Sequence, residues 1–158
     1  MTETLSDAEL VERLAHLPVD RDNAEHYRGY LRRELVLNRC ADCGRWHQPM
    51  RPMCPSCWSW NVVPTAVRGR GTVHLFIALH QGPPADGVDY TKGPHPVVTV
   101  ELEEQPALRF TSTVVDCALD DVHIGMPVEL TWIERSGAPY PAFRPAAGTD
   151  GTPNGEGR

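Results

Sequence analysis

The sequence contains no long apolar run. No stretch approaches the roughly 18 to 20 consecutive apolar residues that cross a bilayer as a helix. Residues 1–17 also lack the basic start and apolar middle of a secretory signal peptide. We therefore expect a soluble, cytoplasmic protein without a membrane partner.

The sequence also lacks the motifs of common catalytic sites. It has no Gly-rich phosphate loop, no nucleophile elbow and no zincin motif. At 158 residues the chain can form one substantial core or two small modules, which is short for an enzyme with separate cofactor and substrate domains. We therefore expect an accessory protein that is not catalytic alone and has no catalytic residue of its own.

Basic charge and strand aromatics are scarce in the second half of the chain. The net charge is −6, and residues 71–158 carry twelve acidic and five basic side chains. Residues 38–70 are basic, with five arginines against one acidic residue. Proteins that bind single-stranded nucleic acid combine a basic groove with stacking aromatics. A nucleic-acid-binding function is therefore a less favoured alternative, and we expect no nucleic-acid partner.

Four of the five cysteines form two Cys-x-x-Cys pairs. Ten residues separate the pair Cys40 and Cys43 from the pair Cys54 and Cys57. Two such turns close one tetrahedral four-sulfur site, so we predict one structural Zn²⁺ bound by these four cysteines. A thioredoxin-type redox pair is less favoured, because it needs one motif at the start of a helix in a βαβ unit. Cys117 lies in an apolar stretch and is interpreted as a small core residue.

Two helices are predicted before the cysteines. Ser6 and Glu9 have capping-box spacing ahead of leucines at helical intervals, which predicts a helix over about residues 7–16. The second helix carries an apolar stripe of Tyr27, Tyr30, Leu31 and Leu35. This stripe either covers the core of the chain or docks on a partner. These residues are candidates for a partner interface because a helix beside a tiny zinc module has little core to cover.

From Val62 onward the pattern changes to strands. GTVHLFIAL, PVVTVELEE, ALRFTSTVVD and PVELTWIER are runs of strand length, and residues 81–96 form a Pro- and Gly-rich loop. About five strands suit a small OB-type barrel or a short sandwich. We expect a helical segment over residues 1–37, a zinc ribbon over 38–61, a barrel over 62–145 and a disordered tail over 146–158.

Several segments together resemble the acyl-CoA-associated zinc-ribbon and OB-fold family. They are LNRCADCG with the helix before it, CPSC, RGRGTVHLF, VELEE, DVHIGMPVELTW and PAFRPA, and the resemblance covers about residues 25–147. Many ribbons share the cysteine pairs, whereas the order of Arg-Gly-Thr-Val, Ile-Gly-Met-Pro-Val and Phe-Arg-Pro is specific. One departure is Trp58, where the family usually has glycine after the last cysteine.

The resemblance implies a mainly β fold in which N-terminal helices precede a rubredoxin-like zinc ribbon and a five-stranded OB-fold barrel. It also implies a non-catalytic subunit that forms a hetero-oligomer with a thiolase-fold enzyme, either a thiolase or a thiolase-like aldolase. That enzyme would act on acyl-CoA thioesters, including steroid side-chain CoA esters. The acyl-CoA would lie near the shared interface, beside residues 81–96. The alternative is a stand-alone acyl-CoA-binding or thioester-handling protein.

Overall fold

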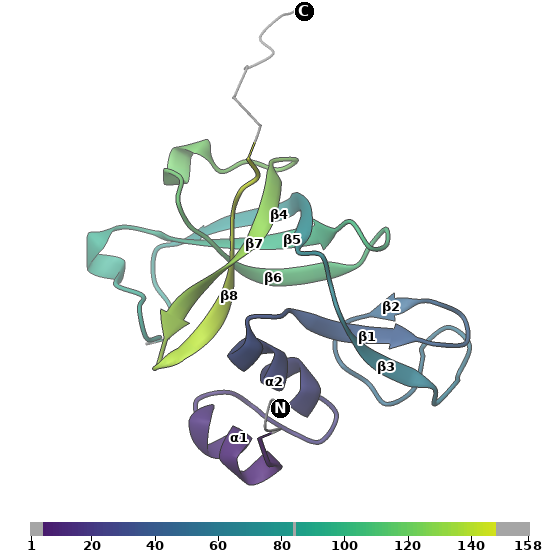
Figure 1. Cartoon of the computed structure of the whole chain (residues 1–158). Helices are drawn as coiled ribbons and strands as arrows, with labels where there is room; N and C mark the ends of the chain where they lie inside the picture. The colour runs from purple at the N-terminus through teal and green to yellow at the C-terminus, as the bar shows by residue number, and fades with distance from the viewer. Residues whose placement is uncertain (1–4, 84, 148–158) are drawn as a thin grey trace, which may run out of the picture.

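The chain folds as a helical unit, a three-stranded ribbon sheet and a closed β-barrel (Figure 1). The computed structural model describes residues 5–83 and 85–147. Helices α1 (Asp7–Arg13) and α2 (Ala24–Arg32) are followed by the ribbon strands β1 (Val36–Cys40), β2 (Trp46–His47) and β3 (Val62–Ala66). This order confirms the predicted mainly β fold with N-terminal helices and a ribbon.

Five strands close the barrel. They are β4 (Arg70–Leu79), β5 (His95–Leu102), β6 (Arg109–Val114), β7 (Pro127–Arg135) and β8 (Ala138–Pro145), in the order β4-β5-β6-β8-β7. Each neighbouring pair is antiparallel except β6 and β8. The connections include two short 3₁₀ turns, η1 (Tyr90–Lys92) and η2 (Leu119–Asp121). The closed barrel decides between the two options that the sequence pattern left open, in favour of the OB type.

The barrel core follows from strand alternation. Successive side chains on a strand point to opposite faces, and on β5 this alternation buries Val98, Val100 and Leu102. Phe110 of β6 and Phe143 of β8 pack edge to face, with 6.5 Å between their ring centroids. These rings and the aliphatic residues of β5 belong to one continuous core.

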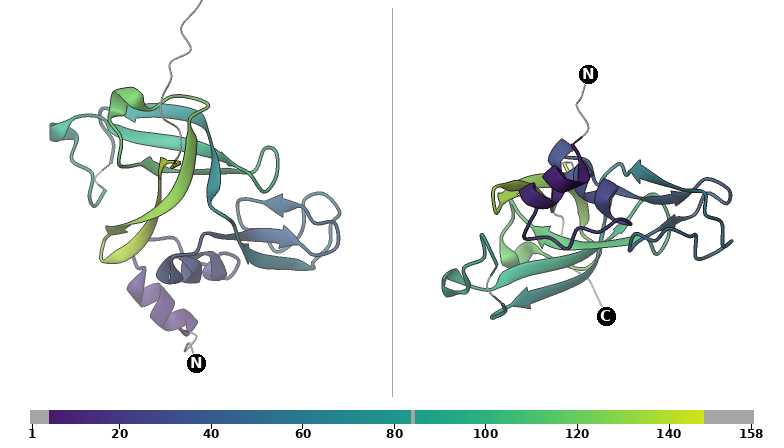
Figure 2. Two further views of the ribbon diagram at one scale, coloured as in Figure 1. Left: turned by 45° about the horizontal axis from the view of Figure 1, so that its top comes forward. Right: turned by 90° about the horizontal axis from the view of Figure 1, so that it is seen from below.

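The strand that begins at Val62 belongs to the ribbon. β3 pairs antiparallel with β1 along its whole length, and Figure 2 shows this sheet beside the barrel. The predicted boundary instead placed residues 62–66 in the barrel, because an apolar strand carries no mark of the sheet that it joins. In the structure the barrel begins at Arg70.

Helix α1 has the predicted capping box. The backbone N–H of Ser6 donates to Glu9 Oε2 at 2.9 Å, and the N–H of Glu9 donates to Ser6 Oγ at 3.4 Å. The helix ends at Arg13, one turn before the predicted end. A small second core joins the helices to the barrel and consists of Leu10, Leu14, Ala24 and Ala138.

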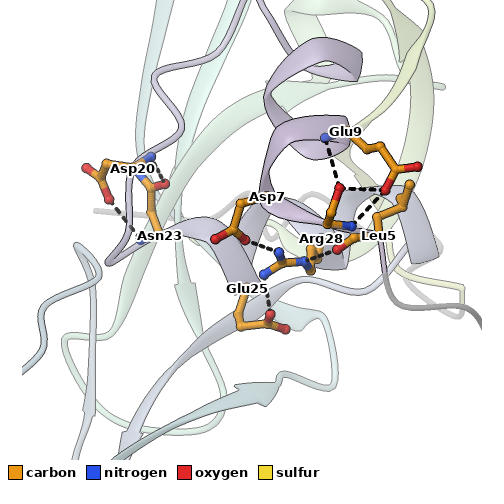
Figure 3. Close-up of polar contacts among 8 residues, drawn as sticks. Leu5, Asp7, Glu9, Asp20, Asn23, Glu25 and Arg28 are labelled. Carbon is orange, nitrogen blue, oxygen red and sulfur yellow. Dashed lines mark hydrogen bonds and ion pairs between the residues drawn. The ribbon is translucent and has the colours of Figure 1, made fainter.

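Arg28 of α2 ties the two helices together (Figure 3). Its guanidinium forms ion pairs with Asp7 of α1 and, at 2.6 Å, with Glu25, and it donates to the Leu5 carbonyl at 3.2 Å. The Asp7 side chain is 85% exposed, so solvent screens its ion pair and the gain in stability is modest. The leucines beneath contribute more to the packing of α1 on α2.

The apolar stripe of α2 faces the barrel of this chain. Tyr30 is 5% exposed, and its ring centroid lies 5.7 Å from that of Trp132 and 6.1 Å from that of Tyr140. Leu35, just beyond the helix, is fully buried. The structure therefore buries Tyr30 and Leu35 in the core of this chain, and contact of the stripe with a partner stays a prediction. The reason for the burial is that α2 packs against β8, which supplies the core that the ribbon alone could not.

Gln105 joins the ribbon to the barrel. It lies between β5 and β6, and its side-chain amide pairs with the backbone of Trp46 in β2. Oε1 accepts from the Trp46 N–H at 3.0 Å, and Nε2 donates to the Trp46 carbonyl at 3.1 Å. The two bonds imitate a rung of a β-ladder. Because the Trp46 ring also belongs to the main core, polar and apolar contacts together fix the ribbon on the barrel.

The C-terminal tail is described only at its start. The Ala146 N–H donates to the Pro127 carbonyl at 3.1 Å, and the rest of the predicted disordered tail, from residue 148 on, lies outside the described residues. Within the described ranges, no helix is long and apolar enough to cross a membrane.

We expect acid to destabilise the fold through His26. Its ring packs between Tyr27, Tyr30 and Phe110, and its Nδ1 lies 2.6 Å from the Val36 carbonyl oxygen. Burial lowers the pKa of His26 below its usual 6.5, so folding favours the neutral ring. This stabilisation is complete above pH 6.5 and is lost as the pH falls toward the lower pKa of the folded state.

Between pH 6.5 and the lower pKa of the folded state, the free energy of unfolding should therefore fall by up to about 1.4 kcal/mol per pH unit. Denaturant titration at several pH values measures this slope. A His26→Gln variant cannot gain the charge and should lose part of the slope. An equal slope in both proteins would assign the acid sensitivity to other histidines, such as His47 and His95, whose pKa values burial also lowers.

Candidate metal centre and exposed surfaces

The two cysteine pairs fold into matching turns. In the first turn the Gly44 N–H donates to the Cys40 carbonyl at 2.9 Å, and in the second the Trp58 N–H donates to the Cys54 carbonyl at 3.0 Å. In both turns the N–H of the first cysteine also donates to the carbonyl five residues later: Cys40 to Arg45 at 2.8 Å, and Cys54 to Ser59 at 2.9 Å. One backbone pattern therefore presents both pairs of sulfurs.

The four sulfurs form a compact cluster. All four Sγ atoms lie within 4.8 Å of one another, with 3.6 Å between Cys40 and Cys57 and 3.7 Å between Cys43 and Cys54. A tetrahedron with zinc–sulfur bonds of about 2.3 Å has edges of about 3.8 Å, so the cluster matches one Zn²⁺. The structure thus brings together the four predicted ligands, and they fit one structural zinc ion.

Hydrogen bonds and charge also suit this cluster to a cation. The N–H groups of Cys57 and Ser56 lower the pKa of the Cys54 thiol to about 7, and backbone N–H groups in the first turn lower the pKa of Cys40. Although the Ser59 N–H favours the Cys57 thiolate, the neighbouring sulfurs raise the pKa of Cys57 to about 12. Several thiolates at this distance repel one another, and a divalent cation removes that repulsion.

Asp42 fastens the first turn to the second. Its carboxylate accepts from the Ser59 hydroxyl and, at 2.9 Å, from Asn61 Nδ2. Hydrogen bonds from these two side chains hold the pKa of Asp42 below its usual value. Sequence reasoning missed this group. The only signal is residue type, because Asp, Ser and Asn favour hydrogen bonds in turns, and residue type does not identify the partner.

The three tryptophans of the ribbon lie in different environments. Trp46 is 9% exposed, and the Arg39 guanidinium carbon lies over its ring, 5.6 Å from the centroid. Trp58 and Trp60 are 70% and 73% exposed. Tryptophan combines a large apolar area with one hydrogen-bond donor and is enriched where proteins meet. The second turn therefore presents two side chains suited to an interface.

Trp58 occupies a backbone position that favours glycine. Its φ is +62°, and φ of Gly44, at the matching position of the first turn, is +75°. A side chain in this left-handed region costs roughly 1–2 kcal/mol. This geometry accounts for the glycine that the resembling family usually has at the position. The exposed indole gains no core contacts in exchange, so it does not serve the stability of the free chain.

His47 and Cys117 lie outside the sulfur cluster. His47 on β2 is 7% exposed, and neither ring nitrogen has a hydrogen-bond partner among the described residues. Cys117 is half-buried against the barrel core, where burial raises the pKa of its thiol. This placement agrees with the interpretation of Cys117 as a core residue.

The predicted partner-interface residues do not form an open face. Tyr30 and Leu35 are core residues, whereas Tyr27 and Leu31 are half-buried against the two cores. Contact of Tyr27 and Leu31 with a partner stays a prediction. Apart from Val11 on α1, the exposed large apolar side chains in the described residues are Trp58, Trp60 and Val63 on the ribbon and Leu75, Ile77 and Ile124 on the barrel.

Metal analysis of the pure protein should find one zinc ion per chain. Replacing Cys40 or Cys57 by serine should release the ion and unfold residues 36–66, because this segment buries too little apolar area to fold without metal. Zinc content and amide exchange in the ribbon measure both effects, with Cys117→Ser as the matched control that keeps them. A Cys40→Ser chain with full zinc and a protected ribbon would contradict the assignment.

Trp58→Gly should raise the free energy of unfolding by up to about 1 kcal/mol, because glycine adopts the left-handed conformation without steric cost. Gly44→Ala is the reverse change in the matching turn. It should lower stability by a similar amount, because alanine is strained in the left-handed conformation. The added Cβ meets no close neighbour, only the end of the Arg39 side chain at 4.0 Å, so a steric clash adds nothing to this cost. Denaturant unfolding of the zinc-loaded proteins measures both. Equal stability of all three proteins would show that these turns are not strained.

Two family descriptions and two solved structures match this chain. Residues 29–63 match the "ChsH2, rubredoxin-like zinc ribbon domain" and residues 64–132 the "ChsH2, C-terminal OB-fold domain". A solved structure described as "Ltp2-ChsH2(DUF35) aldolase" is similar, with a TM-score of 0.72 and 35% identity over 82% of this chain and 98% of that chain. A DUF35-family structure from Sulfolobus solfataricus, at 12% identity and a TM-score of 0.53, shares the fold over 89% of this chain and 95% of its own.

Curated relatives match this chain over part of their own length. A "Probable enoyl-CoA hydratase alpha subunit" of Thermomonospora curvata is 39% identical over 81% of this chain and 39% of that protein. "DUF35 domain-containing scaffold" proteins of Methanocaldococcus jannaschii and Methanothermobacter thermautotrophicus are 36% and 32% identical, over 60% and 64% of this chain and 64% and 73% of theirs. The chain thus spans less than two thirds of the first two relatives. Its ribbon, its barrel and these matches show that the chain belongs to the ChsH2 and DUF35 family, which confirms the resemblance inferred from the sequence.

Proposed function

We propose that this chain is a non-catalytic accessory subunit that binds a thiolase-fold enzyme and supports its action on acyl-CoA thioesters. The likeness to the Ltp2-ChsH2(DUF35) aldolase structure carries the proposal, because it covers nearly all of that chain at 35% identity. The description of that structure joins a ChsH2(DUF35) component with a second component, Ltp2, in one aldolase. Relatives described as scaffold proteins support the same class of role.

Exposed apolar side chains support a role in assembly. Trp58 and Trp60 are exposed on the ribbon, and Leu75 and Ile77 are exposed on the barrel. Large apolar side chains in water favour burial against another protein, and tryptophan often contributes most to binding at the centre of an interface. Because Gln105 fixes the ribbon on the barrel, the two surfaces keep a fixed geometry relative to each other.

The metal centre supports a structural role for this chain. Four cysteine sulfurs complete the tetrahedral shell of zinc, and the bound ion supplies folding energy to the ribbon. Cys40 ends β1, the central strand of the ribbon sheet. Cys57 immediately precedes Trp58, so the metal holds the turn from which the exposed indoles extend. Loss of zinc would therefore remove that surface.

We place the acyl-CoA near the interface with the enzyme, beside residues 81–96. Two acidic side chains hold the described part of this loop. Asp86 accepts from the backbone N–H of Ser136 in the β7–β8 hairpin, and Asp89 accepts from the Thr91 N–H at 3.0 Å. A loop held in this way can border a site on a neighbouring subunit. Steroid side-chain CoA esters are one candidate substrate, and thiolysis, condensation and retro-aldol cleavage are the candidate reactions.

The chain should form a complex with a thiolase-fold enzyme of its own host. Affinity purification followed by mass spectrometry identifies the enzyme, and calorimetry with both pure proteins measures the affinity. Acyl-CoA turnover should need the enzyme and rise when the chain is added, whereas a Cys40→Ser chain, with its ribbon unfolded, should not raise it. Failure of the two pure proteins to bind would contradict the accessory role. Turnover by the pure chain alone would favour the stand-alone thioester-handling alternative.

A further inference from the structure

We propose that the free edge of β4 binds an extended segment of the partner enzyme as an added β-strand. This inference rests on the proposed accessory function and names the surface that would hold the enzyme. β4 pairs with β5 from Gly71 to Leu79, but it pairs with β7 only from Arg70 to Thr72. Among the described residues, the segment 74–79 therefore has a strand neighbour on one side only.

The register shows which backbone groups face the open side. The Val73 N–H donates to the Met126 carbonyl at 3.0 Å, and the Val73 carbonyl accepts from the Gly125 N–H at 2.7 Å. The backbone N–H and C=O groups of Val73 therefore point away from β5. A bulge follows at His74. Residues of an antiparallel pair alternate between hydrogen-bonded and non-hydrogen-bonded positions. Before the bulge, the residues whose backbone groups point away from β5 have odd numbers, and the one extra residue shifts them to even numbers after it.

Ala78 supports this assignment independently. It lies opposite Pro96 of β5, which has no N–H and cannot complete a hydrogen-bonded pair. The Pro96 carbonyl instead accepts from the Thr113 hydroxyl of β6 at 2.8 Å. The N–H and C=O groups of Ala78, and by alternation those of Phe76, therefore point away from β5. Within the described part of the chain they have no hydrogen-bond partner.

The side chains along this edge suit an uncharged, apolar strand. Leu75 and Ile77 are 50% and 45% exposed and lie opposite Thr99 and Val97 of β5. Residues 73–80 include no Lys, Arg, Asp, Glu or Pro, although edge strands commonly use Lys, other charged residues or Pro to repel additional strands. An edge with free backbone groups and apolar side chains is a template for strand addition.

The surroundings leave this edge accessible. β4 and β5 run along the side of the barrel away from α1 and α2 (Figure 2). Ile124 is 65% exposed and precedes the two residues that bond to Val73, so it borders the beginning of the open edge. An added strand would therefore lie along the exposed side chains of Leu75 and Ile77, with Ile124 near the start of the edge.

A different chain is favoured over a second copy of this one. Residues 74–79 offer few hydrogen bonds. Their contact with an added strand would also bury much less surface area than the roughly 1,200 Å² that a specific, stable interface buries. The edge must therefore be one part of a larger interface. The proposed function supplies such an interface with an enzyme of a different fold, whose segment at this edge should be extended, uncharged and apolar at alternate positions.

Ala78→Pro tests the inference, because it removes an outward N–H and leaves the bonds to β5 intact. Ala78→Ser keeps the N–H and is the matched control. In titrations with the thiolase-fold enzyme that binds the wild-type chain, Ala78→Pro should weaken binding by about tenfold or more, and Ala78→Ser by about twofold or less. Zinc content and melting temperature should match the wild type in both variants.

Amide exchange on the wild-type chain is the second measurement. The Phe76 and Ala78 amides should exchange quickly in the free chain and slowly in the complex. Unchanged exchange, or equal affinity of Ala78→Pro and the wild type, would overturn the strand inference and leave the accessory function standing. Failure of the wild-type chain to bind the enzyme would overturn both. If sedimentation shows a wild-type dimer that Ala78→Pro dissociates, the occupant is a second copy and the proposed one is wrong.

Discussion

Mutual repulsion among the cysteine thiolates is the constraint on which the ribbon depends. Backbone hydrogen bonds favour both the Cys54 and the Cys57 thiolate, but at Cys57 the neighbouring sulfurs outweigh them and raise the pKa. A divalent cation resolves the conflict and links two turns that lie far apart in the ribbon sequence. Structural zinc contributes roughly 10–16 kcal/mol in small zinc-finger peptides, which is more than the few buried side chains of this ribbon can supply. The fold of the ribbon is therefore set by metal affinity more than by apolar burial.

The ribbon in turn completes the core of the barrel. Leu37 of β1 and Trp46 of β2 belong to the same buried cluster as Val100 and Phe143 of the barrel, and the Gln105 amide bonds to the Trp46 backbone. Metal, ribbon and barrel thus form one connected structure, with α2 packed along it. Disturbing the sulfurs would loosen contacts well beyond the ribbon. A metal with a complete ligand shell can in this way control how a subunit presents its surface to an enzyme.

Local patterns predicted the features that depend on near neighbours in sequence. The cysteine spacing predicted the zinc ligands, and the Ser6–Glu9 spacing predicted a real capping box. Strand alternation predicted strands but left barrel and sandwich open, and the family resemblance implied the OB-fold barrel that the structure shows. The features that were missed all depend on distant partners. The packing of α2 on β8 decided that Tyr30 is a core residue, and the pairing of β3 with β1 moved the ribbon boundary. No local signal marks Gln105 as the residue that bonds to Trp46, because a single glutamine in a turn has many possible partners.

Two features of the free chain are unfavourable on their own. Trp58 holds a large side chain in a left-handed conformation and leaves it in water. Within the described ranges, residues 74–79 of β4, with the exposed Leu75 and Ile77, have a strand neighbour on one side only. Glycine at position 58 would relieve the first feature, and a charged residue on the β4 edge would discourage an added strand. Both features lie on elements that the zinc site and the Gln105 bridge hold in fixed positions. Rigid placement of unfavourable groups lowers the conformational entropy lost when a partner covers them. In the proposed complex, the enzyme would cover the exposed groups that are unfavourable in the free chain.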